Sequence, residues 1–333
     1  MKEEHQEGEF CMRTIRHSYK KQRRDRRGIL LLALLFFFFF PYIVSNFSNT
    51  EKQSLERKVV PGEIWVSQKK IFGEVKIPLE EYLEGMLAAT IPVEYHIEAL
   101  KAQGIILRTF CMSKVEKKDG SKVVWDDEIK ELYLTPEECG MLWGEEKEKN
   151  RNKIKQALSE TKGMIVVSEG TIPQLPFSRI SNGSTRDISE YVVNEEKFSY
   201  MKAVACPEDV MAENYIQYVE ISIEEFQKKL QKQIENKKAS LGRMVLYRDK
   251  QEYVRDVEIG EETIDGESFK KALELTSSCF YIEKIDNIIQ IKTKGMGHGF
   301  GFSQYSADKM AEKGESYEAL LYYFFDNISL EKV

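Results

Sequence analysis

The stretch that decides the fold, GMGHGFGFSQYSA, runs from Gly295 to Ala307. Glycines alternate with other residues at positions 295, 297, 299 and 301, and His298 lies among them. Alternating glycine permits a positive φ and lets the backbone approach another segment or a ligand closely. Ser303 is expected to cap a short helix, QYSADKMAEKG, that ends at Gly314. The pattern predicts a binding site in which an imidazole precedes a helix N-terminus. A glycine-rich loop that only closes a barrel is the structural alternative.

Length and composition limit the number of domains and the kinds of partner and cofactor to expect. The chain has 333 residues, 42% hydrophobic and 31% charged, enough for one large domain or two small ones. Its net charge of −6 argues against nucleic acid as the main partner. The five cysteines form no CxxC pair, and beyond the N-terminal region the histidines are His96 and His298. We therefore expect no metal site and no cofactor.

The N-terminal region has a charge pattern of its own. Residues 13–27 carry eight basic side chains and one acidic one, and the uncharged run ILLLALLFFFFFPYIV follows at 29–44. This pattern predicts a basic cytoplasmic tail (1–28), a transmembrane anchor (29–47) and a polar linker (48–61). It makes the chain a single-pass cell-membrane protein whose C-terminal domain lies outside the cytoplasm. A cleaved signal peptide is the alternative, which the long basic region and the lack of an A-x-A site disfavour.

Helix and strand patterns alternate through the rest of the chain. Strand-like runs at 63–70 and 74–79 precede a helix expected to begin at Pro78. A second helix, expected to begin at Pro92, is apolar over much of its circumference and so should be buried. The patterns predict an α+β fold, a mixed helix and strand single domain with short β-hairpins around buried helices. An inserted α/β subdomain at about 208–290 and one N-terminal transmembrane helix complete the prediction.

A few polar residues interrupt the second helical pattern. Glu94, Glu98 and Lys101 have the spacing of ordinary surface pairs. Gln103 and Arg108 lie deeper, and for Arg108 a structural ion pair is favoured over a ligand contact. A second polar loop, SRISNGSTRDISEYV at 178–192, crowds hydroxyl groups together at positions that include Ser181 and Thr185. A plain Asx or Ser turn is the alternative for that loop.

Three of these segments resemble the stage II sporulation protein D family (the SpoIID/LytB domain). Gly295–Ala307 follows the family signature Gly-x-Gly-His-Gly-x-Gly-x-Ser-Gln-Tyr-Gly-Ala and departs only at Ser306. EALKAQGIILRTF at 98–110 is similar to a family helix. SNGST resembles the family's Ser-Gly-Gly-x-Thr motif with Asn182 in place of the first glycine, and Asn tolerates a positive φ. The resemblance covers roughly residues 62–330.

The resemblance implies a lytic transglycosylase that cuts peptidoglycan glycan strands between N-acetylmuramic acid and N-acetylglucosamine, in sporulation and engulfment. One carboxylic acid protonates the leaving oxygen and then takes the proton of the C6 hydroxyl, which leaves a 1,6-anhydro end without metal or cofactor. The family's acid is the Glu of a Glu-Met-Pro tripeptide, and the matching segment here is Thr90-Ile91-Pro92. Glu94 is the candidate replacement acid. The substrate-binding candidates are Thr90, Lys101, Gln103, Arg108, Ser181, Thr185, His298, Ser303, Gln304 and Tyr305.

Two functions follow from the loss of the family's acid. One is an active transglycosylase with a displaced acid, and the other is an inactive relative that holds glycan or a partner protein as a scaffold. A membrane-tethered solute receptor would need only an anchor and a pocket, and the Gly295–Ala307 signature argues against it. The expected partners are peptidoglycan glycan strands, the cytoplasmic membrane through residues 29–47, and other sporulation or septal wall proteins, with no nucleic acid.

Overall fold

The computed structural model describes residues 64–70, 73–118, 121–129, 133–191, 198–231 and 244–333. The predicted cytoplasmic tail, anchor (29–47) and linker all lie outside these ranges. Among the helices within them, none has both the length and the hydrophobicity that crossing a bilayer requires. On this finding the prediction of an N-terminal transmembrane helix is corrected, and with it the single-pass membrane location. The described fold is a mixed α/β one with several separate sheets.

Eight α-helices are described, and their bounds match apolar stripes in the sequence. They are α2 (Leu79–Thr90), α3 (Ile97–Met112), α4 (Pro136–Trp143), α5 (Lys147–Glu160), α6 (Ile223–Leu230), α7 (Gly266–Ala272), α8 (Gln304–Glu312) and α9 (Tyr317–Phe324). A short 3-10 helix, Pro207–Met211, precedes the first strand of the later sheets.

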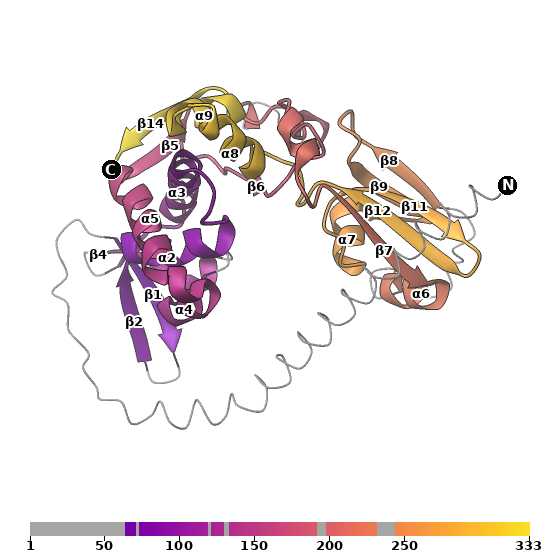
Figure 1. Cartoon of the computed structure of the whole chain (residues 1–333), viewed down its shortest axis with the longest axis horizontal. Coiled ribbons are helices and arrows are strands. Elements are labelled where there is room, and N and C mark those ends of the chain that lie inside the picture. Colours follow the sequence, from indigo (N-terminus) through magenta and orange to yellow (C-terminus); the bar gives the residue numbers. More distant parts are fainter. Residues whose placement is uncertain (1–63, 71–72, 119–120, 130–132, 192–197, 232–243) are drawn as a thin grey trace, which may run out of the picture. The chain divides into compact units, whose positions relative to one another are not determined.

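The strands form five small sheets rather than one large one (Figure 1). Their bounds are β1 (Ile64–Lys70), β2 (Gly73–Pro78), β3 (Glu116–Lys118), β4 (Ser121–Trp125), β5 (Met164–Ser168), β6 (Phe177–Ser178), β7 (Ile216–Ser222), β8 (Met244–Arg248), β9 (Val254–Ile259), β10 (Glu262–Asp265), β11 (Cys279–Ile285), β12 (Ile288–Lys294), β13 (Phe302–Ser303) and β14 (Ile328–Lys332). The sheet orders are β2-β1-β4-β3, β10-β9-β8, β11-β12-β7, β13-β6 and β14-β5. Strands β1 and β4 are parallel, as are β6 and β13, and the other pairs are antiparallel.

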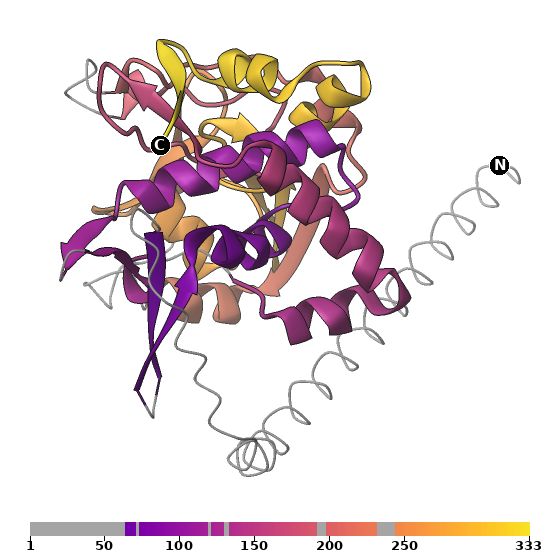
Figure 2. The ribbon, with the colours of Figure 1, turned by 90° about the vertical axis from the view of Figure 1, so that its left-hand side faces the viewer.

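Helix α3 is the central element of the N-terminal and C-terminal parts of the described chain. It contacts α2 and α5, and also β5, α8 and α9. Figure 2 shows the yellow C-terminal helices to one side of it. Leu100 and Leu107 pack in one apolar cluster with α2 and α5, whereas Ala99 and Ile106 pack in another with α8 and α9. This two-sided burial explains why the sequence of α3 is apolar over most of its circumference.

A third apolar cluster belongs to the later strands. Val257, Phe280 and Ile291 from the two three-stranded sheets pack with Phe226 of α6 and Phe269 of α7. Phe269 and Phe280 stack, with ring centroids 5.2 Å apart. In β7 and β12 the side chains alternate between this cluster and the surface, the usual pattern of a sheet with one buried face.

The predicted start of α3 was wrong by five residues. Pro92 begins a turn, closed by a hydrogen bond from the Tyr95 N–H to the Pro92 carbonyl, and the helix begins only at Ile97. The backbone N–H of His96 donates to Asp308 on α8 at 2.7 Å. This contact fixes His96 in a non-helical conformation with ψ of 145°, so the preceding turn cannot join the helix.

Candidate functional site

Thr90 lies at the C-terminal end of α2, where its carbonyl oxygen is the centre of a polar cluster. The Gln304 side-chain amide donates to that oxygen at 2.9 Å and to the Gln103 side chain at 3.1 Å. Arg179 donates to the same oxygen over a longer distance, 3.5 Å. The Thr90 hydroxyl donates backward to the Met86 carbonyl at 2.8 Å and is buried. The structure thus brings Thr90, Gln103 and Gln304 together, from three different segments of the chain.

Two tyrosines extend this cluster toward the surface. Tyr95 and Tyr305 meet edge to face with ring centroids 6.4 Å apart, and both are half-buried. Burial raises the pKa of Tyr95 to about 12, so its hydroxyl remains protonated beside Arg179. Glu94 precedes Tyr95 in the turn between α2 and α3 and is exposed. Lys153 holds this turn by donating to the carbonyls of both Glu94 and Tyr95.

Asp209 ties the start of α8 to the polar loop at 178–192. One of its oxygens accepts from the Ser181 N–H and from the Ser303 hydroxyl, and the other accepts from the Ser306 hydroxyl. Burial raises the pKa of this carboxyl, and the three hydrogen bonds act in the opposite direction. Ser303 was expected to cap α8 with its side chain, but it makes no capping hydrogen bond because its hydroxyl faces Asp209. Ser306, the departure from the family signature, also finds its partner here.

His298 has its ring held in one orientation by the glycine-rich loop. Its Nδ1 accepts from the Phe300 N–H at 3.0 Å and lies 3.4 Å from the Ser178 hydroxyl. An accepting Nδ1 places the proton of the neutral ring on Nε2. Burial lowers the pKa of His298 to about 4, with the Glu267 carboxylate opposing the shift. At neutral pH the ring is therefore an uncharged hydrogen-bond donor through Nε2.

The glycines of this loop are required by close packing as well as by conformation. All four have positive φ values, from 70° at Gly301 to 122° at Gly297. A Cβ on Gly299 would lie 2.4 Å from the ring of Tyr253, which is 1% exposed and cannot move aside. The backbone of the loop therefore runs directly against buried side chains.

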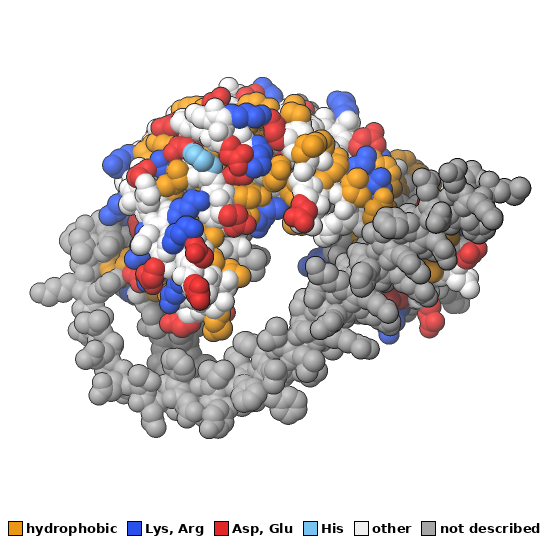
Figure 3. Space-filling model, viewed as in Figure 1, with side chains coloured by type: hydrophobic (Ala, Val, Ile, Leu, Met, Phe, Trp, Pro, Cys, Tyr) orange, Lys and Arg blue, Asp and Glu red, His pale blue; other side chains and the backbone are white. Residues whose placement is uncertain are grey.

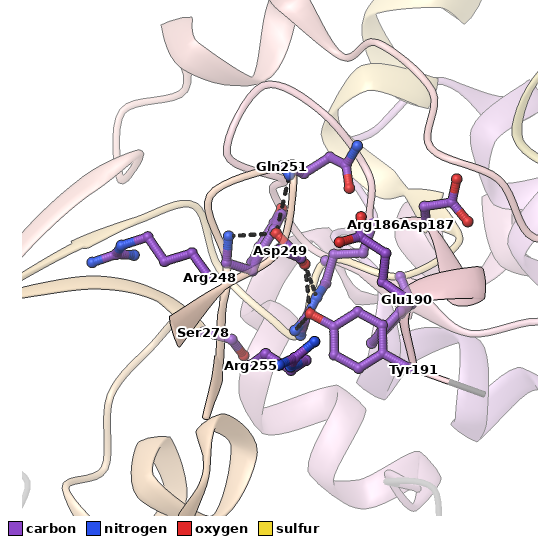
Figure 4. Close-up of polar contacts among 12 residues, drawn as sticks. Arg186, Asp187, Glu190, Tyr191, Arg248, Asp249, Gln251, Arg255 and Ser278 are labelled. Atoms are coloured by element: carbon purple, nitrogen blue, oxygen red, sulfur yellow. Dashed lines mark hydrogen bonds and ion pairs between the residues drawn. The ribbon is translucent and has the colours of Figure 1, made fainter. Parts of the chain in front are cut away.

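Arg186 binds the loop from the other side and is almost fully buried (Figure 4). Its guanidinium donates to Asp249 at 2.9 Å, to Glu267 at 3.2 Å and to the His298 carbonyl at 3.0 Å. The rings of Tyr191, Tyr253 and Phe300 surround it, with centroids 4.5–5.0 Å from the guanidinium carbon. A buried guanidinium with two carboxylate partners and three rings is a structural clamp, not a free ligand-binding group.

Three predicted binding residues lie in structural contacts away from Thr90. Lys101 pairs with Glu98 at 2.6 Å and with Glu160 at 2.5 Å on the outer side of α3. Arg108 makes a two-pronged ion pair with Glu80, each contact 2.8 Å long. The Thr185 hydroxyl is buried and exchanges hydrogen bonds with the backbone at 202–204. Each of these side chains makes its ion pairs or hydrogen bonds with a neighbouring part of the fold.

Sequence reasoning missed three residues that organise the site: Arg179, Arg186 and Asp209. Arg179 and Arg186 both lie in the loop SRISNGSTRDISEYV, in which hydroxyl residues were predicted to bind a ligand. Asp209 follows Cys206-Pro207-Glu208 and looks like an ordinary acidic turn residue. The signal that could have found the arginines is the presence of two cations close together in one short polar loop. No local signal marked Asp209, because its partners are 28 to 97 positions away.

The face of the molecule in Figure 3 has no large region of one charge in its described part. In Figure 3, Lys and Arg side chains are interspersed with Asp and Glu side chains over the described part of the visible face. The described part of this face therefore offers no large region of one charge that would attract a charged ligand over a long distance.

Comparison with known proteins identifies the family of this chain. The family model described as stage II sporulation protein matches residues 67–167, which contain α2, α3 and all but the last residue of β5. Stage II sporulation protein D of Bacillus amyloliquefaciens is 31% identical over 261 residues, 77% of this chain and 75% of that protein. Stage II sporulation protein D of Bacillus subtilis (strain 168) is 30% identical over 262 residues, with the same two shares. The chain therefore belongs to the stage II sporulation protein D family.

Proposed function

We propose that this sporulation-family protein binds the glycan strands of peptidoglycan and does not cut them. The observation that carries the proposal is Thr90, which stands where the resemblance places the family's acid. Its hydroxyl is buried and donates to the Met86 carbonyl. A hydroxyl cannot protonate a glycosidic oxygen near neutral pH, since its proton is far too weakly acidic.

The position of Glu94 argues against a displaced acid. A carboxylic acid that protonates a glycosidic oxygen near neutral pH is normally kept protonated by burial against apolar groups. Glu94 is exposed in the turn after α2, where water solvates its carboxylate. We therefore do not expect transglycosylase activity through Glu94, and the Glu94→Gln variant tests this expectation.

The groups around Thr90 suit a sugar ligand. Tyr95 and Tyr305 contribute half-buried rings and hydroxyls, with the Lys309 ammonium over the Tyr305 ring, and rings of this kind pack against the apolar faces of sugars. Arg179 is half-buried beside them and has no carboxylate within ion-pair distance in the part of the chain that the structure describes. By contrast, Arg108 and Arg186 are each paired with carboxylates. A guanidinium without a counter-charge is available to oxygen atoms of a ligand.

The test uses the full chain with purified peptidoglycan, both intact and stripped of its stem peptides. Sedimentation measures binding, and mass spectrometry of the soluble fraction detects 1,6-anhydro products. We expect binding without anhydro products, and weaker binding in Arg179→Ala and Tyr305→Ala, by about tenfold for each lost ligand contact.

Thr90→Glu examines the missing acid directly, because it restores a carboxyl group at the end of α2. We expect anhydro products from this variant and none from Thr171→Glu, which adds a carboxyl group at an exposed turn. Products from the natural protein that disappear in Glu94→Gln would overturn the proposal in favour of an active enzyme. Failure to sediment with either form of peptidoglycan would leave a partner-protein scaffold as the function.

A further inference from the structure

The outer face of the β11-β12-β7 sheet carries an ordered set of polar side chains (Figure 1). The inner face, which includes Phe280 and Ile291, packs with α6 and α7 in the third apolar cluster. Side chains alternate along each strand, so the residues between these lie on the outer face. The strand register sets them in rows across the sheet: Lys294 and Ile216 in one row, Tyr281, Lys292 and Tyr218 in the next, and Glu283, Gln290 and Glu220 in the one after. Tyr218 is 59% exposed, so this face is open along β7.

Three cations gather at one end of this outer face. The Arg248 guanidinium carbon, at the end of β8, lies 4.3 Å from the centroid of the Tyr281 ring, and the Lys294 ammonium nitrogen lies 5.1 Å from the same centroid. Lys292 is the partner of Tyr281 in the strand register. Within the described ranges, none of the three cations has a carboxylate at ion-pair distance. They are therefore available to the anionic groups of a partner.

The positions of these cations are set by the fold. Arg248 donates to the carbonyls of Glu252 and Phe280 at 2.9 Å and 2.8 Å, which holds its guanidinium beside Tyr281. Burial raises the pKa of Tyr281, the Glu252 carboxylate adds to this shift and Arg248 opposes it, so the ring stays neutral and does not cancel the charge of the cations. Lys292 and Lys294 are two residues apart on β12, so their side chains leave the sheet about 7 Å apart. A preset spacing lowers the cost of binding a partner whose charges repeat at short intervals.

We propose that this face binds an anionic polymer in which polyol units are joined by phosphodiesters. Its phosphates bind Arg248, Lys292 and Lys294, and the carbon chain between two phosphates packs on the exposed ring of Tyr218. Phosphodiesters recur at every unit of such a polymer, whereas a peptidoglycan glycan strand has its carboxyl-bearing substituents only on alternate sugars. The close spacing of the three cations therefore fits the phosphate polymer better than the glycan strand.

The carboxylates of the next row favour a single polymer chain over a membrane. Glu220 and Glu283 are both exposed, and a flat anionic lipid surface placed on this face would meet them as well as the cations. A polymer chain can follow the rows of Lys292 and Lys294 and leave both carboxylates in water. Nucleic acid shares the phosphodiester, but the net charge of −6 argues against it as a partner.

The test measures the fluorescence anisotropy of labelled poly(glycerol phosphate) as the full chain is added, in neutral buffer of low ionic strength. We expect binding that weakens as salt is added, because the contacts are between charges at the surface. The competitors are oligothymidylate, polyglutamate and phosphatidylglycerol vesicles, each at the same concentration of negative charge as unlabelled poly(glycerol phosphate). The unlabelled polymer should displace the label at least about tenfold more effectively than any of them. Equal or better displacement by one competitor would overturn the proposal and identify that class as the partner.

Variants locate the binding on the outer face. The double variant Lys292→Gln with Lys294→Gln removes two charges from side chains that make no hydrogen bond or ion pair among the described residues. It should bind poly(glycerol phosphate) at least about tenfold more weakly than the natural protein. The matched control, Lys271→Gln with Lys284→Gln, removes the same charge from exposed positions on α7 and on the other side of β11, and should bind like the natural protein.

Equal affinity in the two double variants would overturn the proposal, as would no binding of the polymer by the natural protein. Lys292 and Lys294 make no contact with the Thr90 cluster among those described, so their double variant should still sediment with peptidoglycan stripped of its stem peptides. Failure of this proposal is therefore distinguishable from failure of the glycan proposal.

Discussion

At the scale of single residues, His298 in the glycine-rich loop makes the free energy of unfolding depend on pH. Burial lowers its pKa to about 4, below the ordinary value of 6.5. Between these values the unfolded chain binds a proton that the folded chain does not, so the free energy of unfolding falls as the pH falls. Above the ordinary pKa of 6.5 the ring is neutral in the folded and the unfolded chain, and this loss of unfolding free energy is absent.

We expect the natural protein to lose roughly 1–2 kcal/mol of unfolding free energy from about pH 7 to about pH 5 relative to His298→Asn. The Asn side-chain oxygen keeps an acceptor for the Phe300 N–H but does not titrate in this range. Urea titrations of both proteins at the two pH values give the difference. Parallel pH profiles of the two proteins would show that His298 is not buried in its neutral form.

Residue-level sequence reasoning succeeded where composition was unusual and failed where contacts were distant. The alternating glycines and His298 marked a tightly packed loop, and all four glycines have positive φ. Thr90 and Gln304 were singled out from the resemblance, and the structure places them in contact. Asp209, Arg179 and Arg186 were missed because their roles arise from partners far along the chain, which local pattern cannot display.

At the scale of elements, glycines in two different loops differ in what an added Cβ would meet. Gly299 has φ of 84° and faces Tyr253, whereas Gly314, after α8, has φ of 102° and nothing within 4 Å of an added Cβ. Both positions carry the conformational penalty of a positive φ, but only Gly299 carries a steric one as well.

Gly314→Ala should therefore cost about 1–2 kcal/mol, and Gly299→Ala roughly 3–5 kcal/mol, of unfolding free energy. Tyr253 cannot relieve the clash, because its hydroxyl accepts from the Asn182 N–H and donates to the Ser184 carbonyl. Chemical denaturation of the two variants measures both costs. Equal costs would mean that the loop yields at Gly299.

Element boundaries, like single residues, were predicted correctly where the signal was local and wrongly where a distant contact decided them. The helix expected from Pro78 runs from Leu79 to Thr90, because its start signal is local. The helix expected from Pro92 begins at Ile97, because the Asp308 carboxylate of α8 binds the His96 N–H. Propensity locates a helix, and a tertiary contact of this kind decides where it begins.

At the scale of the molecule, the final strand completes a sheet whose other strand lies in the middle of the chain. β14 pairs with β5, and Ile328 and Leu330 pack against the cluster that contains Val166 and Phe324. The Val333 N–H donates to the Gly163 carbonyl, which extends the pairing by one residue. Removing the strand would uncover both a sheet edge and part of a core.

Deletion of residues 328–333 should lower the free energy of unfolding by roughly 2–4 kcal/mol, from two half-buried aliphatic side chains and a strand of hydrogen bonds. Thermal unfolding followed by circular dichroism measures the change. Glu331→Ala, exposed on the same strand, is the control and should change stability by less than about 0.5 kcal/mol. A deletion as stable as this control would mean that β5 does not need its partner.

The contacts at position 90 have a consequence for the evolution of the family. Gln304 and Arg179 both reach the main-chain carbonyl of Thr90, and neither touches its side chain through a hydrogen bond described here. These two hydrogen bonds therefore do not depend on which side chain stands at position 90, although that side chain is itself buried. Under the function proposed above, one replacement at position 90 removes or restores an acid while the hydrogen bonds of Gln304 and Arg179 to the main chain are kept.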